Sequence, residues 1–185
     1  FNQNFNHLKV HTQYSICEGA AKIDDLQEYC KSNKIKSLGI SDTSNLCGAL
    51  EFAEKISKSG TQPIIGTQIN FKLNDTTGLL PLFALNETGY KNIIKLSSNS
   101  YLENDELSDP HVNFDELLKN SDGVSVFSGT VLGLFGKLFD KGKFTEIDEI
   151  YSKIKEVFGD RFYLEIQRHN DTNENGFEKF NLKKS

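Results

Sequence analysis

The apolar residues of this chain recur with two different periods, which predicts strands that alternate with helices. Short apolar runs predict strands over 7–11, 37–41, 63–71, 79–85, 123–129 and 162–167. Apolar residues at helical spacing predict helices over 22–33, 45–60, 88–102, 113–123, 143–160 and 177–185. The segment 143–160 has the clearest amphipathic stripe, so it is the best-defined element in this pattern.

Local signals mark several helix ends. Gly60 stands where a helix commonly stops. Thr88 is placed to open the helix over 88–102. Asn113, followed three residues later by Glu116, has the spacing of a capping box and predicts a helix start there.

The alternation of strands and helices predicts an α/β fold with a parallel sheet and helices outside it. A barrel and a doubly wound sheet both fit this order. Polar residues gather at the ends of the predicted strands, and in a parallel barrel these ends meet on one face. The strands are too few to close an eight-stranded barrel. The length predicts one domain, residues 1–185.

Composition narrows the class of protein. The formal net charge is −5, which argues against the basic surface needed for tight duplex binding. No apolar run is long enough to cross a membrane, and the first residues lack a signal-peptide core, so we expect a cytoplasmic protein. Cys17, Cys30 and Cys47 form no CxxC pair, which favours free thiols. The missing methionine and the unfinished helix at 177–185 lead us to expect a longer natural chain.

The first predicted strand carries the candidate chemistry. His7, Lys9 and His11 are spaced two apart, so on a strand they form one row on the same face. Imidazoles in such a row are typical ligands for zinc and similar ions. The ammonium group of Lys9 in the middle has the wrong charge for a cation site. The row alone therefore leaves open whether the site binds a metal.

Six blocks of sequence then carry a family resemblance: HLKVHTQYSICEGA, LGISDTSNLCGALEF, QPIIGTQINF, FALNETGYKNIIKLSS, VFSGT and FYLEIQRHN. In this order they resemble the PHP (polymerase and histidinol phosphatase) domain at the N-terminus of bacterial replicative DNA polymerase III alpha subunits. The resemblance implies a distorted (β/α)7 barrel, similar to metal-dependent hydrolases and incomplete here at its C-terminus. It also implies a bacterial parent polymerase whose palm, thumb and fingers lie outside this chain.

The resemblance also bears on metal binding. In family members with an intact site, the strand ends hold a polynuclear metal cluster that hydrolyses phosphoesters. Carried over one position at a time, the pattern leaves His11 and Glu18 as possible ligands, and further ligands would lie beyond Ser185. The other matched positions hold residues that are not ligands: Lys9, Thr43, Gln68, Leu79 and Thr130. Because divalent metals need several converging donors, we predict a vestigial, metal-free site without a cofactor.

Three residues of this region receive specific expectations. We predict that Lys9 lies near Glu18 and replaces part of the metal's charge, because an uncompensated buried carboxylate is costly. For His7 a ligand role is possible, but a structural hydrogen bond is favoured. Asp42 is either catalytic or, as we favour, a cap for the next turn or helix.

Two further segments leave alternatives open. Arg168 and His169 follow the last predicted strand and would either grip a phosphate or acidic partner surface or form a solvated loop, which we favour. The apolar stripe over 132–139 is interpreted as barrel packing, with a docking surface as the alternative.

The resemblance implies a structural and interaction role for this domain. Its partners would be the proofreading exonuclease subunit, other replicase subunits including the sliding clamp, and primer-template DNA through the rest of the chain, with no membrane contact. The parent polymerase would use Mg²⁺ in two-metal phosphoryl transfer at carboxylates outside this chain. The alternative is a metal-dependent phosphoesterase, either a PHP 3′–5′ exonuclease or a histidinol-phosphate-type phosphatase. A sugar-type barrel enzyme with chance similarity is disfavoured by the six ordered blocks.

Overall fold

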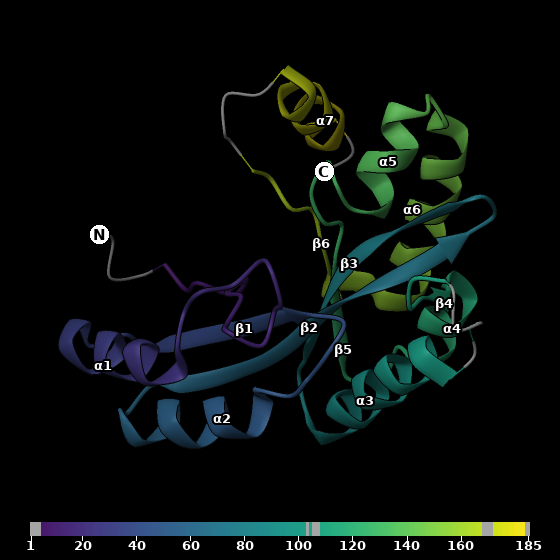
Figure 1. Cartoon of the computed structure of the whole chain (residues 1–185). Coiled ribbons are helices and arrows are strands. Elements are labelled where there is room, and N and C mark those ends of the chain that lie inside the picture. The colour runs from purple at the N-terminus through teal and green to yellow at the C-terminus, as the bar shows by residue number, and fades with distance from the viewer. Residues whose placement is uncertain (1–4, 103, 105–107, 168–171, 184–185) are drawn as a thin grey trace.

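The structure is a computed structural model that describes residues 5–102, 104, 108–167 and 172–183. A twisted mixed sheet runs through the molecule, with helices packed around it (Figure 1). The strands are β1 (Ser37–Thr43), β2 (Gln62–Leu73), β3 (Thr76–Ala84), β4 (Val112–Asn113), β5 (Val124–Phe127) and β6 (Phe162–Tyr163). The helices are α1 (Ile23–Asn33), α2 (Ala49–Lys58), α3 (Glu87–Leu102), α4 (Phe114–Lys119), α5 (Leu134–Asp140), α6 (Phe144–Phe158) and α7 (Thr172–Leu182), with a 3₁₀ turn over Gly159–Arg161.

The order of strands in the sheet is β1-β2-β3-β5-β6, and β4 pairs with the far half of β2. The prediction of a purely parallel sheet is wrong at β3, which runs antiparallel to both β2 and β5. The physical reason is the short turn at Asn74 and Asp75, because two strands joined by so few residues can pair only as an antiparallel hairpin. Asn74 has a φ of 51°, a left-handed conformation that Asn tolerates in turns. The α/β class itself is confirmed.

The predicted strand over 7–11 is an extended segment that lies beside β1 but forms little regular ladder. The amide of Gly39 donates to the carbonyl oxygen of His7 at 2.7 Å, and the amide of Ser41 donates to that of Val10 at 2.8 Å. A side chain at Gly39 would collide with the backbone of Leu8, so glycine permits this close approach. The segment therefore forms the outermost layer of the sheet on the β1 side.

Among the described residues, six of the seven helices overlap predicted ones, whereas α5 lies in a stretch predicted only as an apolar stripe, and several helix ends differ. The helix predicted over 45–60 begins at Ala49, and Gly60 after it has the positive φ of 79° expected of a stop. Helix α3 is opened by Asn86 rather than Thr88, because the Asn86 Oδ1 accepts the amide of Gly89 at 2.9 Å. The predicted capping box is wrong. Asn113 precedes α4 without a side-chain cap bond. Instead of reaching back to the N-cap amide, Glu116 pairs with Lys119 at 2.7 Å.

Two hydrophobic clusters hold these layers together. The larger one lies between the centre of the sheet and helices α3 to α6, and it includes the fully buried rings of Phe71, Phe135 and Phe158. The smaller one packs α1 and α2 against β1 through Leu38 and Phe52. The apolar stripe predicted over 132–139 contributes Leu134, Phe135 and Leu138 to the larger cluster, which confirms its packing role. In the described part of the chain, no helix is long and apolar enough to span a membrane.

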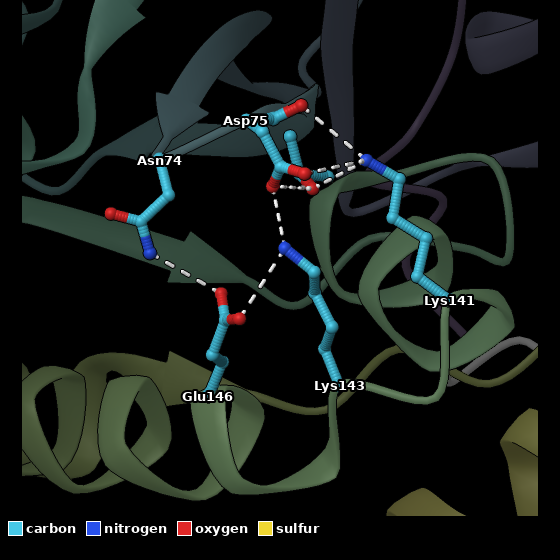
Figure 2. Close-up of polar contacts among 6 residues, drawn as sticks. Asn74, Asp75, Lys141, Lys143 and Glu146 are labelled. Atoms are coloured by element: carbon cyan, nitrogen blue, oxygen red, sulfur yellow. Dashed lines mark hydrogen bonds and ion pairs between the residues drawn. The ribbon is translucent and has the colours of Figure 1, made fainter.

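A charged cluster fastens the tip of the β2–β3 hairpin to the connection between α5 and α6 (Figure 2). The Lys143 Nζ lies 2.5 Å from the Asp75 Oδ1 and 3.3 Å from the Glu146 Oε1. The Asn74 amide donates to Glu146 at 3.3 Å, and the Lys141 Nζ lies 3.9 Å from the second oxygen of Asp75. The ammonium of Lys143 holds the pKa of Asp75 below its usual value, and Asp75 in turn raises the pKa of Lys143.

Candidate functional site

A cavity of about 490 Å³ lies between the N-terminal segment, the middle of β2 and β3, the loop after β5 and the segment after β6. Most of the residues singled out in the sequence line this one cavity: His7, Lys9, His11, Glu18, Gln68, Leu79 and Thr130. Thr43 contacts the cavity wall through Glu18 and Gln68, to which it is hydrogen bonded. The fold thus brings together residues spread over most of the sequence.

Two residues that line the cavity, Lys9 and Glu165, form an ion pair. The Lys9 Nζ donates to the Glu165 Oε1 at 3.0 Å, and the two side chains are 21% and 13% exposed. Lys9 and Glu18 both line this cavity, but the carboxylate that Lys9 contacts is that of Glu165 rather than the expected Glu18. Lys9 lies on the N-terminal segment outside β1 and reaches across to the segment that follows β6. Glu18 lies on a loop, and its carboxylate accepts a hydrogen bond from the Thr43 hydroxyl.

Glu165 is held in place by the segments around it. Its amide donates to the Ser128 Oγ at 2.9 Å, which fixes the segment after β6 against the end of β5. The side-chain amide of Gln167 donates to the same carboxylate oxygen that Lys9 contacts, at 3.2 Å. The ion pair therefore has a fixed acceptor rather than a freely rotating one.

Sequence reasoning missed Glu165. The signal was present, because an acidic residue that interrupts the apolar run over 162–167 stands near a strand end, where polar residues of such folds gather. The contact with Lys9 joins residues 156 positions apart, and no local pattern encodes that pairing.

Glu18, Thr43 and Gln68, three of the positions singled out in the sequence, form a chain of hydrogen bonds. The Gln68 Nε2 donates to the Thr43 Oγ1 at 2.7 Å, and that hydroxyl in turn donates to the Glu18 carboxylate. The carboxylate of Glu18 is thus hydrogen bonded to a neutral hydroxyl, and the amide of Gln68 orients that hydroxyl. This geometry gives each of the three polar groups a partner within the protein.

Two buried atoms of the cavity have no partner in the described part of the chain. They are the Nδ1 of His11 and the Oε2 of Glu165. The ring of His7 packs edge-on against that of Phe5, with centroids 5.0 Å apart, and its carbonyl holds β1 as described above. His7 therefore has a structural contact with the sheet in addition to its place on the cavity wall.

Asp42 is 1% exposed and serves as an acceptor for the turn after the N-terminal segment. Its carboxylate accepts the Thr12 amide at 2.6 Å, the Thr12 hydroxyl at 2.7 Å and the Ser15 hydroxyl at 2.7 Å. Asp42 therefore acts as a cap, as favoured, but it caps a turn that precedes it in the sequence and not the next turn or helix. Each of these bonds stabilises the loop that carries Glu18.

The residues of the cavity do not fit a polynuclear metal centre. Within residues 5–102, 104, 108–167 and 172–183, no group of three or more His, Cys, Asp or Glu side chains could hold a metal ion. The ammonium of Lys9 also lies among the donors, where its charge opposes a second cation. Arg168 and His169 lie outside the described residues. Cys17 and Cys47 are exposed free thiols, and Cys30 is buried.

Comparison with known proteins gives one family and a consistent set of relatives. The family described as PHP domain matches residues 7–169. The DNA polymerase III subunit alpha of Caulobacter vibrioides is 37% identical over 180 residues, which cover 90% of this chain and 15% of that protein. The protein of the same name from Borreliella burgdorferi is 38% identical over 91% of this chain and 16% of its own length. The one from Haemophilus influenzae is 33% identical over 97% of this chain.

Solved structures show weaker similarity. An amidohydrolase from Chromobacterium violaceum aligns with a TM-score of 0.40 and 13% identity over 51% of this chain and 34% of its own. A putative metal-dependent phosphoesterase from Bifidobacterium adolescentis aligns with a TM-score of 0.39 and 16% identity over 63% of this chain and 43% of its own. The chain spans about 15% of the length of the curated relatives it matches. Since the family match extends over residues 7–169, this chain belongs to the PHP domain family.

Proposed function

We propose that this chain is the N-terminal PHP domain of a bacterial, cytoplasmic DNA polymerase III alpha subunit, and that it acts there without a metal. The relatives that match about 90% of the chain carry that name, and the match occupies about 15% of their length. Replicative DNA synthesis, with Mg²⁺ at the polymerase centre, would then take place in the remainder of the longer protein. The role of this domain would be structural.

The Lys9–Glu165 ion pair is the observation that carries this proposal. Lys9 stands at the position of the family's first metal ligand, and its ammonium contacts a carboxylate that is 13% exposed. A carboxylate withdrawn from water needs a compensating positive charge. The lysine supplies that charge, and in doing so it ties the N-terminal segment to the segment after β6. It would thus perform the crosslinking task of the metal and none of its chemistry.

The series of hydrogen bonds from Gln68 through Thr43 to Glu18 also supports this proposal. The carboxylate of Glu18 is satisfied by a hydroxyl whose other partner is a neutral amide. A Lewis acid that activates water needs converging anionic or imidazole ligands with an open position. Glu18, Thr43 and Gln68 already bond to one another, so these three residues do not supply such a set of ligands. Phosphoester hydrolysis is therefore not assigned to this cavity.

The partner proposed for the domain is the proofreading exonuclease subunit, with the sliding clamp, other replicase subunits and primer-template DNA contacted through the rest of the longer chain. Three exposed apolar side chains stand on the wall of the cavity and support a contact surface at its mouth: Phe5, Leu132 and Ile166 are 65%, 75% and 40% exposed. Exposed apolar side chains that gather on one surface are typical of protein-binding sites.

Elemental analysis of the purified protein for zinc, manganese and iron tests the metal-free proposal. We expect metal far below one ion per chain after dialysis, and no hydrolysis of a generic phosphoester substrate. Stoichiometric metal that disappears together with phosphoesterase activity in His11→Ala would instead favour the metal-dependent phosphoesterase. Glu28→Ala, at an exposed position on α1, is the matched control.

Docking is tested by gel filtration of the longer protein with the proofreading exonuclease of the same organism. Leu132→Asp should weaken the complex at least about tenfold if the apolar mouth is the contact, because a charge would be buried there. Leu85→Asp is the control, since Leu85 is 57% exposed and does not line the cavity. Equal affinity for both variants would place the contact elsewhere.

A further inference from the structure

Two neighbouring loops at the start of β1 and β2 carry a group of lysines. The loop from α1 to β1 contacts the loop from α2 to β2, because the Thr61 hydroxyl donates to the carbonyl of Ile35 at 2.7 Å. The amide of Gln62 also donates to the carbonyl of Lys36, at 2.9 Å. Four exposed lysines stand on these loops or at the helix ends beside them, and they are called the lysine patch below: Lys31, Lys34, Lys36 and Lys58.

The lysine patch lies at the opposite end of β1 from the candidate site. The strand begins at Ser37, beside the patch, and ends at Thr43, whose hydroxyl bonds to two residues of the cavity wall. A strand of 7 residues spans about 20 Å. The patch is therefore separate from the cavity and from the Lys9–Glu165 ion pair.

The ammonium groups of the lysine patch are not neutralised by nearby carboxylates. Among the described residues none of the four lysines forms an ion pair, although glutamates stand three and four positions before Lys31 and Lys58. Elsewhere the same spacing does form a pair, as between Glu87 and Lys91. The segments 29–41 and 55–74 contain no acidic residue, in a chain that has 26 of them. A local positive surface thus stands on a chain of net charge −5.

Helix stability accounts for only part of the lysine patch. Lysines near the end of a helix interact favourably with the helix dipole, which explains Lys31 on α1 and Lys58 on α2. Lys36 lies beyond the helix, in the connection to β1. Lys34, directly after α1, has a left-handed φ of 52°, a conformation in which glycine is usual and a side chain costs backbone energy. Since a purely structural helix end favours glycine there, Lys34 points to a use for its charge.

The side chains around the lysines match the chemistry of a phosphate backbone. Exposed neutral polar residues alternate with the lysines: Ser32, Asn33, Ser57 and Gln62. Lysine together with Ser, Asn and Gln side chains is the combination that contacts phosphate oxygens in protein–DNA complexes. Exposed large apolar side chains, which mark protein-binding surfaces, do not occur within 31–37 or 57–62. The surface therefore fits DNA better than it fits an acidic protein.

We propose that the lysine patch contacts the phosphate backbone of the duplex part of primer-template DNA. The inference rests on the parent polymerase proposed above, and it adds a DNA contact made by this domain to those made by the rest of the longer chain. A net charge of −5 suits a contact that is weak alone. The longer chain already holds the DNA, which raises its effective concentration at the patch. Each phosphate contact adds about 0.9 to the slope of log affinity against log salt.

Fluorescence anisotropy of a labelled primer-template with a long duplex, titrated with the purified longer protein that contains residues 1–185, tests this inference. With all four patch lysines changed to Gln, binding at about 50 mM salt should weaken at least about tenfold, and the salt slope should fall by about 3–4. The matched control changes four other exposed lysines to Gln, with the same change in net charge: Lys72, Lys91, Lys95 and Lys153. The control should alter affinity by less than about twofold.

Lys34→Gly separates DNA binding from folding. It removes one ammonium group and relieves the left-handed backbone, so the protein should be at least as stable while the salt slope falls by about 0.9. Equal losses in the patch and control variants, or no loss in either, would overturn the proposal. A patch variant that binds DNA normally but loses a replicase subunit would also overturn it, in favour of an acidic protein partner. An unmodified longer protein that binds no primer-template would overturn the proposed polymerase function as well, whereas DNA binding that ignores the patch contradicts this inference alone.

Discussion

The ammonium of Lys9 lies 3.0 Å from the carboxylate of Glu165, and this contact joins the two outermost segments of an open sheet. Lys9 stands outside β1, whereas Glu165 follows β6 at the opposite end of the strand order. An ion pair between such distant segments restricts how far the sheet can open.

Removing the lysine should therefore destabilise the fold. Lys9→Met leaves the Glu165 carboxylate without its cation, and we expect a loss of about 1–3 kcal/mol in unfolding free energy, less than for a fully buried pair. Urea unfolding followed by circular dichroism measures it. Lys91→Met is the matched control, because the Lys91–Glu87 pair is exposed and should contribute little. Equal stability of the two variants would remove the structural role assigned to Lys9.

Asp42 should contribute more to stability than an exposed aspartate. Asp42→Ala leaves the Thr12 amide and the hydroxyls of Thr12 and Ser15 without an acceptor, which should cost about 2–4 kcal/mol. Thermal and urea unfolding provide the measurement, with Asp122→Ala at an exposed turn as the control. A loss no larger than that of the control would contradict the capping role of Asp42.

The two asparagines at helix starts should differ in their effects. Asn86→Ala removes the bond to the amide of Gly89 at the start of α3 and should cost about 1 kcal/mol. Asn113→Ala should cost much less, because its side chain makes no cap bond to α4. Unfolding free energies of the two variants, measured in parallel, check this. A larger loss at Asn113 would restore the capping box that the sequence predicts.

The charged cluster at the tip of the β2–β3 hairpin should make the unfolding free energy depend on pH in the acidic range. Lys143 lowers the pKa of Asp75 in the folded protein. The resulting stabilisation is present above the unfolded pKa of Asp75, about 3.9, and is lost as the pH falls through the lower folded value. Asp75→Asn should remove this part of the acid dependence below about pH 4 and change little at pH 7 beyond the loss of the pair. Unfolding curves from pH 2 to 7 measure it, and because the Asp75 side chain is 67% exposed, added salt should reduce the difference.

Local features of the fold could be predicted from sequence, and long-range ones could not. The stripe over 143–160 gave α6 because its period is set by the helix itself, and Gly60 marked the end of α2 for a similar local reason. The direction of β3 depends on how few residues join it to β2, and the spacing of apolar residues within each strand carries no information about that direction. The segment at 7–11 has strand-like spacing, but it is joined to its neighbour β1 by only a few backbone hydrogen bonds among the described residues.

The candidate site shows the same division. The family pattern located the positions His11, Glu18, Thr43, Gln68, Leu79 and Thr130, and the structure brings them to one cavity or its wall. It did not identify Glu165 as the partner of Lys9. Which acid a lysine meets depends on the distance that the folded sheet leaves between its outer segments. That quantity is a result of packing rather than of any short motif.

Thermal and urea unfolding in excess chelator, and then in excess Zn²⁺ or Mn²⁺, tests the central claim most directly. A metal that binds the folded state at 100 times its dissociation constant would add about 2.7 kcal/mol of stability. If Lys9 has replaced the metal, the unfolding free energy of the unmodified protein should be the same in chelator and in either metal. A loss of stability in chelator that is restored by metal, and abolished by His11→Ala, would contradict the account.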